Sequence, residues 1–94
     1  YLKILTTTIN KKYLQANIKV YPNPFRKNAI IDIQNLELQK TTLVLFDIAG
    51  KEILQLQSNN NQYQIDGNNL ERGMYLFSIK NDQEEIATGK LMVQ

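Results

Sequence analysis

Residues 70–80 read LERGMYLFSIK, and this stretch decides the fold class. Tyr75 follows Leu70 by five positions and Gly73 by two, which is the spacing of a tyrosine corner, where a strand's first tyrosine returns its hydroxyl to the backbone upstream. Beyond the corner, apolar side chains at Tyr75, Phe77 and Ile79 alternate with outward positions, as in a strand with one buried face. The stretch therefore predicts a β-strand of a packed sheet.

Six further β-prone runs surround this stretch, and turn residues rich in Asn, Asp and Gly separate them. The seven predicted strands are residues 18–21, 29–34, 41–48, 51–57, 62–66, 74–80 and 85–93. The gaps are too short for the crossovers that parallel strands need, so the pairing is antiparallel. Together with the tyrosine corner, this predicts an all-β, immunoglobulin-like antiparallel β-sandwich of about seven strands.

Alternation along the runs assigns the faces of the predicted sheets. The expected core-facing residues are Ile31, Ile33, Leu43, Leu45, Ile53, Tyr63, Ile65, Tyr75, Phe77 and Ile79. In the last run Ile86 has the opposite parity to Leu91 and Val93, so one face holds all three only if a residue bulges out, and Gly89 is the expected bulge.

Two runs are apolar on both faces, which places Val44 and Phe46, and later Met74 and Leu76, on the outside of the sheet. An exposed apolar patch for a partner protein is one explanation. Cover by the N-terminal segment or by long neighbouring side chains is the other.

Length and composition fit one domain. The chain has 94 residues, so we expect residues 1–17 to be a linker or the tail of a preceding cargo region and residues 18–94 to form the domain. It has no Cys and no His, which removes disulfides, thiolate nucleophiles, imidazole bases and most metal-ligand sets. No cofactor or metal is predicted.

Charge and hydropathy exclude two further classes of function. Every acidic residue lies at Asp32 or later, whereas six of the eleven basic residues precede it. The aromatics among these six are too few for a nucleic-acid surface, so a solvated linker is the better interpretation. No apolar run approaches the length of a membrane span. Since neither Met nor a signal pattern begins the chain, we expect a fragment whose export signal lies upstream.

No catalytic constellation can be assembled from these residues. The pairs at Gly50 and Lys51 and at Gly89 and Lys90 lack the earlier Gly and the following Ser or Thr of a phosphate loop. The two serines, Ser58 and Ser78, have no His to activate them. The domain is predicted not to be an enzyme.

Four segments, taken in order, resemble the type A C-terminal sorting domains of type IX secretion. They are residues 20–24 (VYPNP), 46–51 (FDIAGK), 70–75 (LERGMY) and 89–93 (GKLMV). The resemblance implies a Bacteroidetes protein whose cargo crosses the outer membrane to the surface or medium through the type IX translocon. It further implies an outer-membrane β-barrel shuttle protein and a surface sortase as partners, with no insertion of the domain itself into the membrane.

The resemblance also assigns residues to partner recognition. They are Pro22, Asn23 and Pro24 at the entry, Gly50 and Lys51 at the central turn, Gly73 and Tyr75 at the corner, and Gly89, Lys90, Leu91, Met92 and Val93 in the terminal strand. The terminal strand is the strongest candidate, because an end strand offers unpaired backbone groups for β-augmentation.

Two other functions fit the same strands. One is an immunoglobulin-like or fibronectin-like accessory module, acting as a spacer or as a weak carbohydrate or adhesion binder of a surface protein. The other is an assembly subunit that keeps the domain as a docking plug and buries the outward patch of Val44, Phe46, Met74 and Leu76 against a partner.

Overall fold

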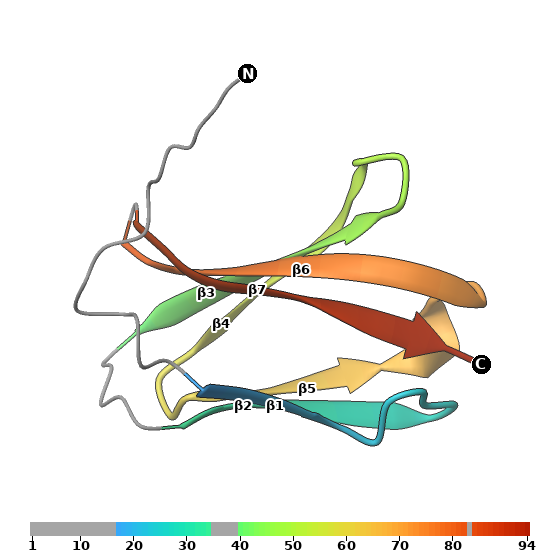
Figure 1. Cartoon of the computed structure of the whole chain (residues 1–94), viewed down its shortest axis with the longest axis horizontal. Helices are drawn as coiled ribbons and strands as arrows, with labels where there is room; N and C mark the ends of the chain where they lie inside the picture. Colours follow the sequence, from blue (N-terminus) through green and yellow to red (C-terminus); the bar gives the residue numbers. More distant parts are fainter. Residues whose placement is uncertain (1–16, 35–39, 83) are drawn as a thin grey trace.

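Seven strands form two stacked antiparallel sheets (Figure 1). The computed structural model describes residues 17–34, 40–82 and 84–94. The strands are β1 (Asn17–Tyr21), β2 (Asn28–Gln34), β3 (Thr41–Asp47), β4 (Glu52–Ser58), β5 (Gln62–Asp66), β6 (Gly73–Asn81) and β7 (Glu84–Val93). This confirms the predicted sandwich, with every strand end within two residues of the expected one. The predicted linker over 1–17 lies outside the described residues, apart from Asn17, which begins β1.

The strand order is that of an immunoglobulin-like sandwich. One sheet has the order β1-β2-β5 and the other β4-β3-β6-β7. In immunoglobulin terms β1, β2 and β5 take the places of strands A, B and E, and the other four those of C′, C, F and G. β7 therefore lies at one edge of the four-stranded sheet.

The core lies between the two sheets, and most of the residues predicted to face inward fill it. The buried apolar side chains of this cluster are Phe25, Ala29, Ile31, Ile33, Leu43, Leu45, Tyr63, Ile65, Tyr75, Phe77, Ile79, Ile86, Leu91 and Val93. One polar pair joins them, since the Thr41 and Tyr63 hydroxyls share a hydrogen bond inside the core. Burial raises the pKa of the Tyr63 hydroxyl.

The prediction for Ile53 was wrong, because Leu54 and Leu56, opposite Leu45 and Leu43, take the inward face of β4. Leu45 of β3 pairs with Leu54, but the next residue, Phe46, pairs with Glu52, so Ile53 is the extra residue between them. Its side chain is 38% exposed, whereas Leu54 and Leu56 pack against the core. Alternation from Leu54 and Leu56 therefore turns Ile53 outward, and the bulge lies beside it.

The last strand does contain a bulge, but not at Gly89. Ile79 pairs with Ala87 and Lys80 with Glu85, which leaves Ile86 as the extra residue and turns its side chain into the core. Gly89 pairs regularly with Phe77, and a β-carbon there would lie 2.4 Å from the Phe77 Cζ atom. Gly89 thus gives room to a buried ring.

A short 3-10 helix, Gly67–Asn69, carries the chain from β5 to β6. The Gly67 N–H donates to the Lys27 carbonyl at 2.7 Å, and a β-carbon on Gly67 would lie 2.7 Å from the Arg26 carbonyl oxygen. Only glycine permits this approach of two backbones. Among the described residues, no helix has the length or hydrophobicity needed to cross a membrane.

Candidate functional site

The Asn23 side chain bonds to the backbone of the last strand. Its Oδ1 accepts from the Met92 N–H at 3.0 Å, and its Nδ2 donates to the Lys90 carbonyl at 3.4 Å. An amide group can bond like one unit of backbone, as donor and acceptor at once. Pro22 and Pro24 flank it, both preceded by cis peptide bonds.

Phe25 continues the same contact with its own backbone. Its N–H donates to the Met92 carbonyl at 3.0 Å, and its carbonyl accepts from the Gln94 N–H at 2.8 Å. These bonds form a parallel bridge between Phe25 and Val93, and the Phe25 ring is only 2% exposed in the core. We call residues 23–25 and their four hydrogen bonds to β7 and Gln94 the clamp.

The clamp bonds to backbone groups of the terminal strand that were expected from the sequence to be unpaired. That strand was expected to offer unpaired backbone groups as far as Val93, but the outward groups of its last residues bond to the clamp. Leu91 and Val93 lie in the core, so in the folded domain a partner meets only the side chains of Lys90, which is exposed, and Met92, which is half-buried.

The central turn between β3 and β4 is organised by Asp47. Its Oδ1 accepts from the N–H groups of Ala49 at 3.0 Å and Lys51 at 2.9 Å, and its own carbonyl accepts from the Gly50 N–H at 3.0 Å. Gly50 has φ +92°, a conformation that favours glycine. The Lys51 side chain is exposed.

Asp47 was not predicted as a residue of the candidate site, although its position just before a turn indicates that it organises the turn. An Asp just before a turn can bond to the backbone two residues on. The sequence LFDIAGK has that form, with the Gly placed where a left-handed residue closes the turn.

The tyrosine corner is confirmed. The Tyr75 hydroxyl donates to the Glu71 carbonyl at 2.7 Å, and the ring is buried with 6% of its surface exposed. Gly73, with φ +139°, begins β6 two residues earlier. Gly73 has no side chain and Tyr75 is buried, so neither can present a side chain to a partner protein. Both residues instead determine the shape of this end of the sandwich.

The four segments with the family's motifs meet at one end of the molecule. Asp47 pairs with Tyr75, Tyr75 pairs with Leu91, and Phe25 bridges to Val93. In Figure 1 this is the end where β6 begins and β7 finishes. We call it the motif end, formed by residues 20–25, 46–51, 70–75 and 89–93, which are the four segments together with Phe25. Segments scattered over most of the sequence thus form one continuous surface.

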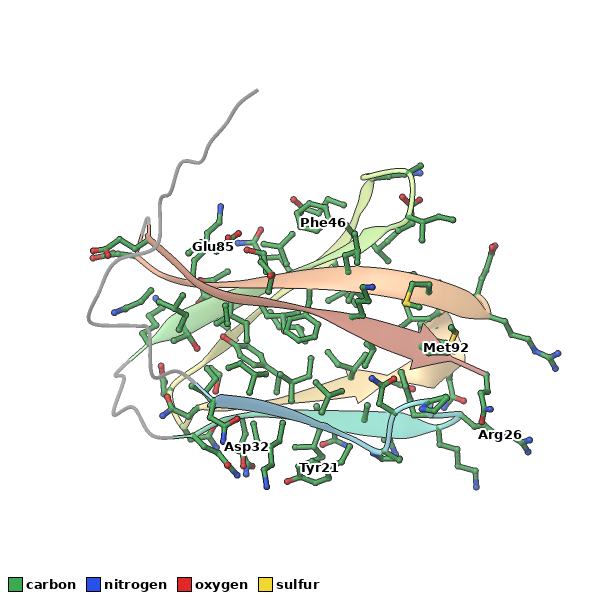
Figure 2. All side chains as sticks on the ribbon, viewed as in Figure 1. Tyr21, Arg26, Asp32, Phe46, Glu85 and Met92 are labelled. Carbon is green, nitrogen blue, oxygen red and sulfur yellow. The ribbon has the colours of Figure 1, made fainter. Side chains whose placement is uncertain are left out.

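The outward apolar residues lie on one face of the four-stranded sheet, as expected. Phe46 pairs with Leu76 and Met74 with Met92, while Val44 pairs with Ser78. Leu76 is 41% exposed, Phe46 and Met74 are half-buried, and Val44 in the middle of the sheet is buried. Figure 2 shows Phe46 and Glu85 on the side of this sheet turned away from the core. We call Val44, Phe46, Met74 and Leu76 the outer patch.

Among residues 17–34, 40–82 and 84–94, no group of three or more His, Cys, Asp or Glu side chains is placed to hold a metal ion. The Ser78 hydroxyl donates to the Glu85 carboxylate at 2.8 Å on the outer face.

Comparison with known proteins agrees with the sequence resemblance. Residues 19–94 match the family described as the secretion system C-terminal sorting domain. The chain is also 26% identical, over 93 residues, to the ulvan lyase NLR42 of Nonlabens ulvanivorans. That similarity covers 98% of this chain and 17% of the lyase, so the chain spans about a sixth of that relative's length.

Proposed function

Because the chain belongs to the family of secretion system C-terminal sorting domains, we propose that its folded sandwich is the signal by which the type IX translocon selects an attached cargo protein. The observation that carries the proposal is the motif end, where all four family segments meet through the pairs Asp47 with Tyr75, Tyr75 with Leu91, and Phe25 with Val93. A translocon that receives many different cargoes needs such a surface, shared by all of them.

The proposed partners are the translocon, an outer-membrane β-barrel shuttle protein and a surface sortase. The sorting domain implies an exported protein on its way to the cell surface. Surface attachment of the cargo belongs to the proposal as well. The motif end presents exposed side chains to such partners, among them Pro22, Asn23, Pro24, Lys51 and Lys90.

In this proposal the domain addresses the cargo and does no chemistry. The relative supports a separation of sorting from catalysis, because the similarity to this chain covers only 17% of the length of an enzyme named as an ulvan lyase. The described residues contain no candidate metal cluster, and the buried polar groups Thr41 and Tyr63 bond to each other inside the core. We propose that any catalytic activity of a cargo does not reside in this domain.

Export of a fluorescent reporter tests the proposal. The reporter is fused ahead of residues 1–94 and expressed in a host with a working type IX system, beside a version ending at Thr88. We expect the full fusion at the surface or in the medium and the truncated one in the periplasm.

The truncation also removes the core residues Leu91 and Val93, so a folded variant is needed beside it. Reversing the exposed charges, Lys51→Glu with Lys90→Glu, changes the motif end without touching the core, and Lys19→Glu on β1 is the matched control. Retention of the full fusion in the periplasm would refute the sorting function and favour an accessory module.

A further inference from the structure

The outer edge of β7 is open over a short and defined length. The clamp shows that the N–H and carbonyl groups of Met92, and the carbonyl of Lys90, point away from β6. Groups of a strand alternate in direction along its length, so the N–H and carbonyl of Thr88 and the N–H of Lys90 also point outward. In the described chain no strand lies against this edge beyond the clamp.

Two features limit the open length. The bulge at Ile86 interrupts the regular ladder on one side of Thr88, and the clamp takes up the edge from the Lys90 carbonyl onward on the other side. Bulges and covered edges are the devices by which proteins prevent unspecific pairing of strands. Only a strand centred opposite Thr88 can pair here, so the register of an added strand is fixed.

A shallow groove of about 360 Å³ lies on the outer face of the sheet over β3, β6 and β7, and reaches the open edge at Thr88. Small side chains form its floor, because Ser78 pairs with Thr88. Phe46 and Leu76 supply an apolar wall, and the Glu85 and Lys90 side chains flank the groove on either side of Thr88. The groove can take one large apolar side chain that enters over Thr88.

From the open edge and this groove we infer that an extended segment of a partner protein adds to β7 antiparallel, with its central residue opposite Thr88. The central side chain is large and apolar and fills the groove beside Leu76. The residue two positions before it is acidic and lies opposite Lys90, and the residue two positions after it is basic and lies near Glu85. The inference rests on the proposed function and locates one contact of the secretion machinery at Thr88 and Lys90 instead of at the last three residues of β7.

Two synthetic peptides test the pairing directly. They are the acetylated, amidated heptapeptides Thr-Asp-Thr-Leu-Thr-Lys-Thr and its charge-swapped form Thr-Lys-Thr-Leu-Thr-Asp-Thr, titrated to millimolar concentration into the isotope-labelled full chain. We expect the first peptide to shift the amide resonances of Thr88 and Lys90 and to slow their hydrogen exchange. It should bind about fivefold more tightly than the second, because each exposed ion pair adds little.

Two variants of Thr88 distinguish the contribution of its backbone N–H to peptide binding from the contribution of its side chain. Thr88→Pro removes the outward N–H while leaving the pairing with β6 in place, since proline is tolerated on an edge strand, and it should abolish binding. Thr88→Val keeps the N–H and the size of the side chain, and it should bind like the wild type. Equal binding of the two peptides, no shift at Thr88, or full binding by Thr88→Pro would overturn the inference. A dimer of the chain that Thr88→Pro dissolves would also overturn it, since β7 would then pair with a second copy.

Export of the reporter fusion distinguishes this inference from the proposed function. If the wild-type fusion is exported and the folded Thr88→Pro fusion is retained, the inference is supported. If both are exported equally, the inference fails while the sorting function stands. If the wild-type fusion is itself retained, the sorting function fails.

Discussion

Replacing Gly89 by Ala should destabilise the domain, because the new methyl group has no space. The added β-carbon would lie 2.4 Å from Cζ and 2.7 Å from Cε2 of Phe77, whereas carbon atoms in good contact are about 3.5–4.0 Å apart. The Phe77 ring is buried among close-packed neighbours and has to move by about 1 Å. Overpacking of this kind costs about 1–3 kcal/mol of unfolding free energy.

Thermal unfolding followed by circular dichroism measures this loss. For a domain of this size each kcal/mol corresponds to about 4–8 °C, so Gly89→Ala at about 2 kcal/mol lowers Tm by roughly 8–16 °C. The exposed neighbour variant Thr88→Ala is the control and should change stability by less than about 0.5 kcal/mol. Adding Phe77→Leu to Gly89→Ala should cost less than the sum of the two single changes, because the clashing ring is gone. A Tm of Gly89→Ala equal to that of the control, or strict additivity of the pair, would refute the reasoning.

Three further predictions concern other parts of the sandwich. Tyr75→Phe removes the hydrogen bond to the Glu71 carbonyl, and urea denaturation should show a loss of about 0.5–1.5 kcal/mol; an unchanged midpoint would mean that the corner adds nothing. The double change Phe46→Ser and Leu76→Ser lies on the outer patch, so the circular dichroism spectrum should stay that of a folded sandwich, and loss of the fold would place these side chains in the core. Burial raises the pKa of Tyr63 in the folded state, so its contribution is complete below pH 10 and is lost as pH rises through the folded pKa; denaturation midpoints should fall above pH 10 in the wild type and fall less in Tyr63→Phe.

The strands and turns could be predicted because their signals are local. Alternating apolar residues and turn-forming Asn, Asp and Gly fix a strand's limits within the strand itself. Asn61 and Asp82 have positive φ, at 62° and 61°, in the turns where the sequence placed such residues. The tyrosine corner could also be predicted from the sequence, because all of its contacts fall within five residues.

The misses concern contacts between segments that are distant in the sequence. Ile53 was placed on the wrong face because the inward face of β4 is set by its pairing with Leu43 and Leu45 of β3, which lie in another strand. Gly89 was taken for the bulge because nothing in its own strand reveals the Phe77 ring that packs over it. Phe25 was not assigned to the core, since it follows the proline motif outside any alternating run.

In the candidate site, too, local features could be predicted from the sequence and contacts between distant segments could not. The four motif segments could be read from the sequence, but their meeting at one end of the sandwich follows from the strand order. The clamp could not be read, because Asn23 and Met92 are 69 residues apart and an Asn between two prolines is equally suited to a plain turn. The expectation that the terminal strand offers unpaired backbone groups was therefore wrong for its last residues.

The clamp also has a consequence for the order of folding. It joins residues 67 to 69 positions apart, whereas a hairpin such as β3–β4 closes across a few. Closure entropy that grows as (3/2)RT ln n makes the longer loop about 2.5 kcal/mol more costly to close than one of four residues. The hairpins should therefore form early and the clamp late, in the slow regime of proteins dominated by non-local pairing. A chain that has not completed this last step has its strands but lacks the surface that the clamp forms with the end of β7. The finished surface therefore distinguishes a completely folded domain from a partly folded one.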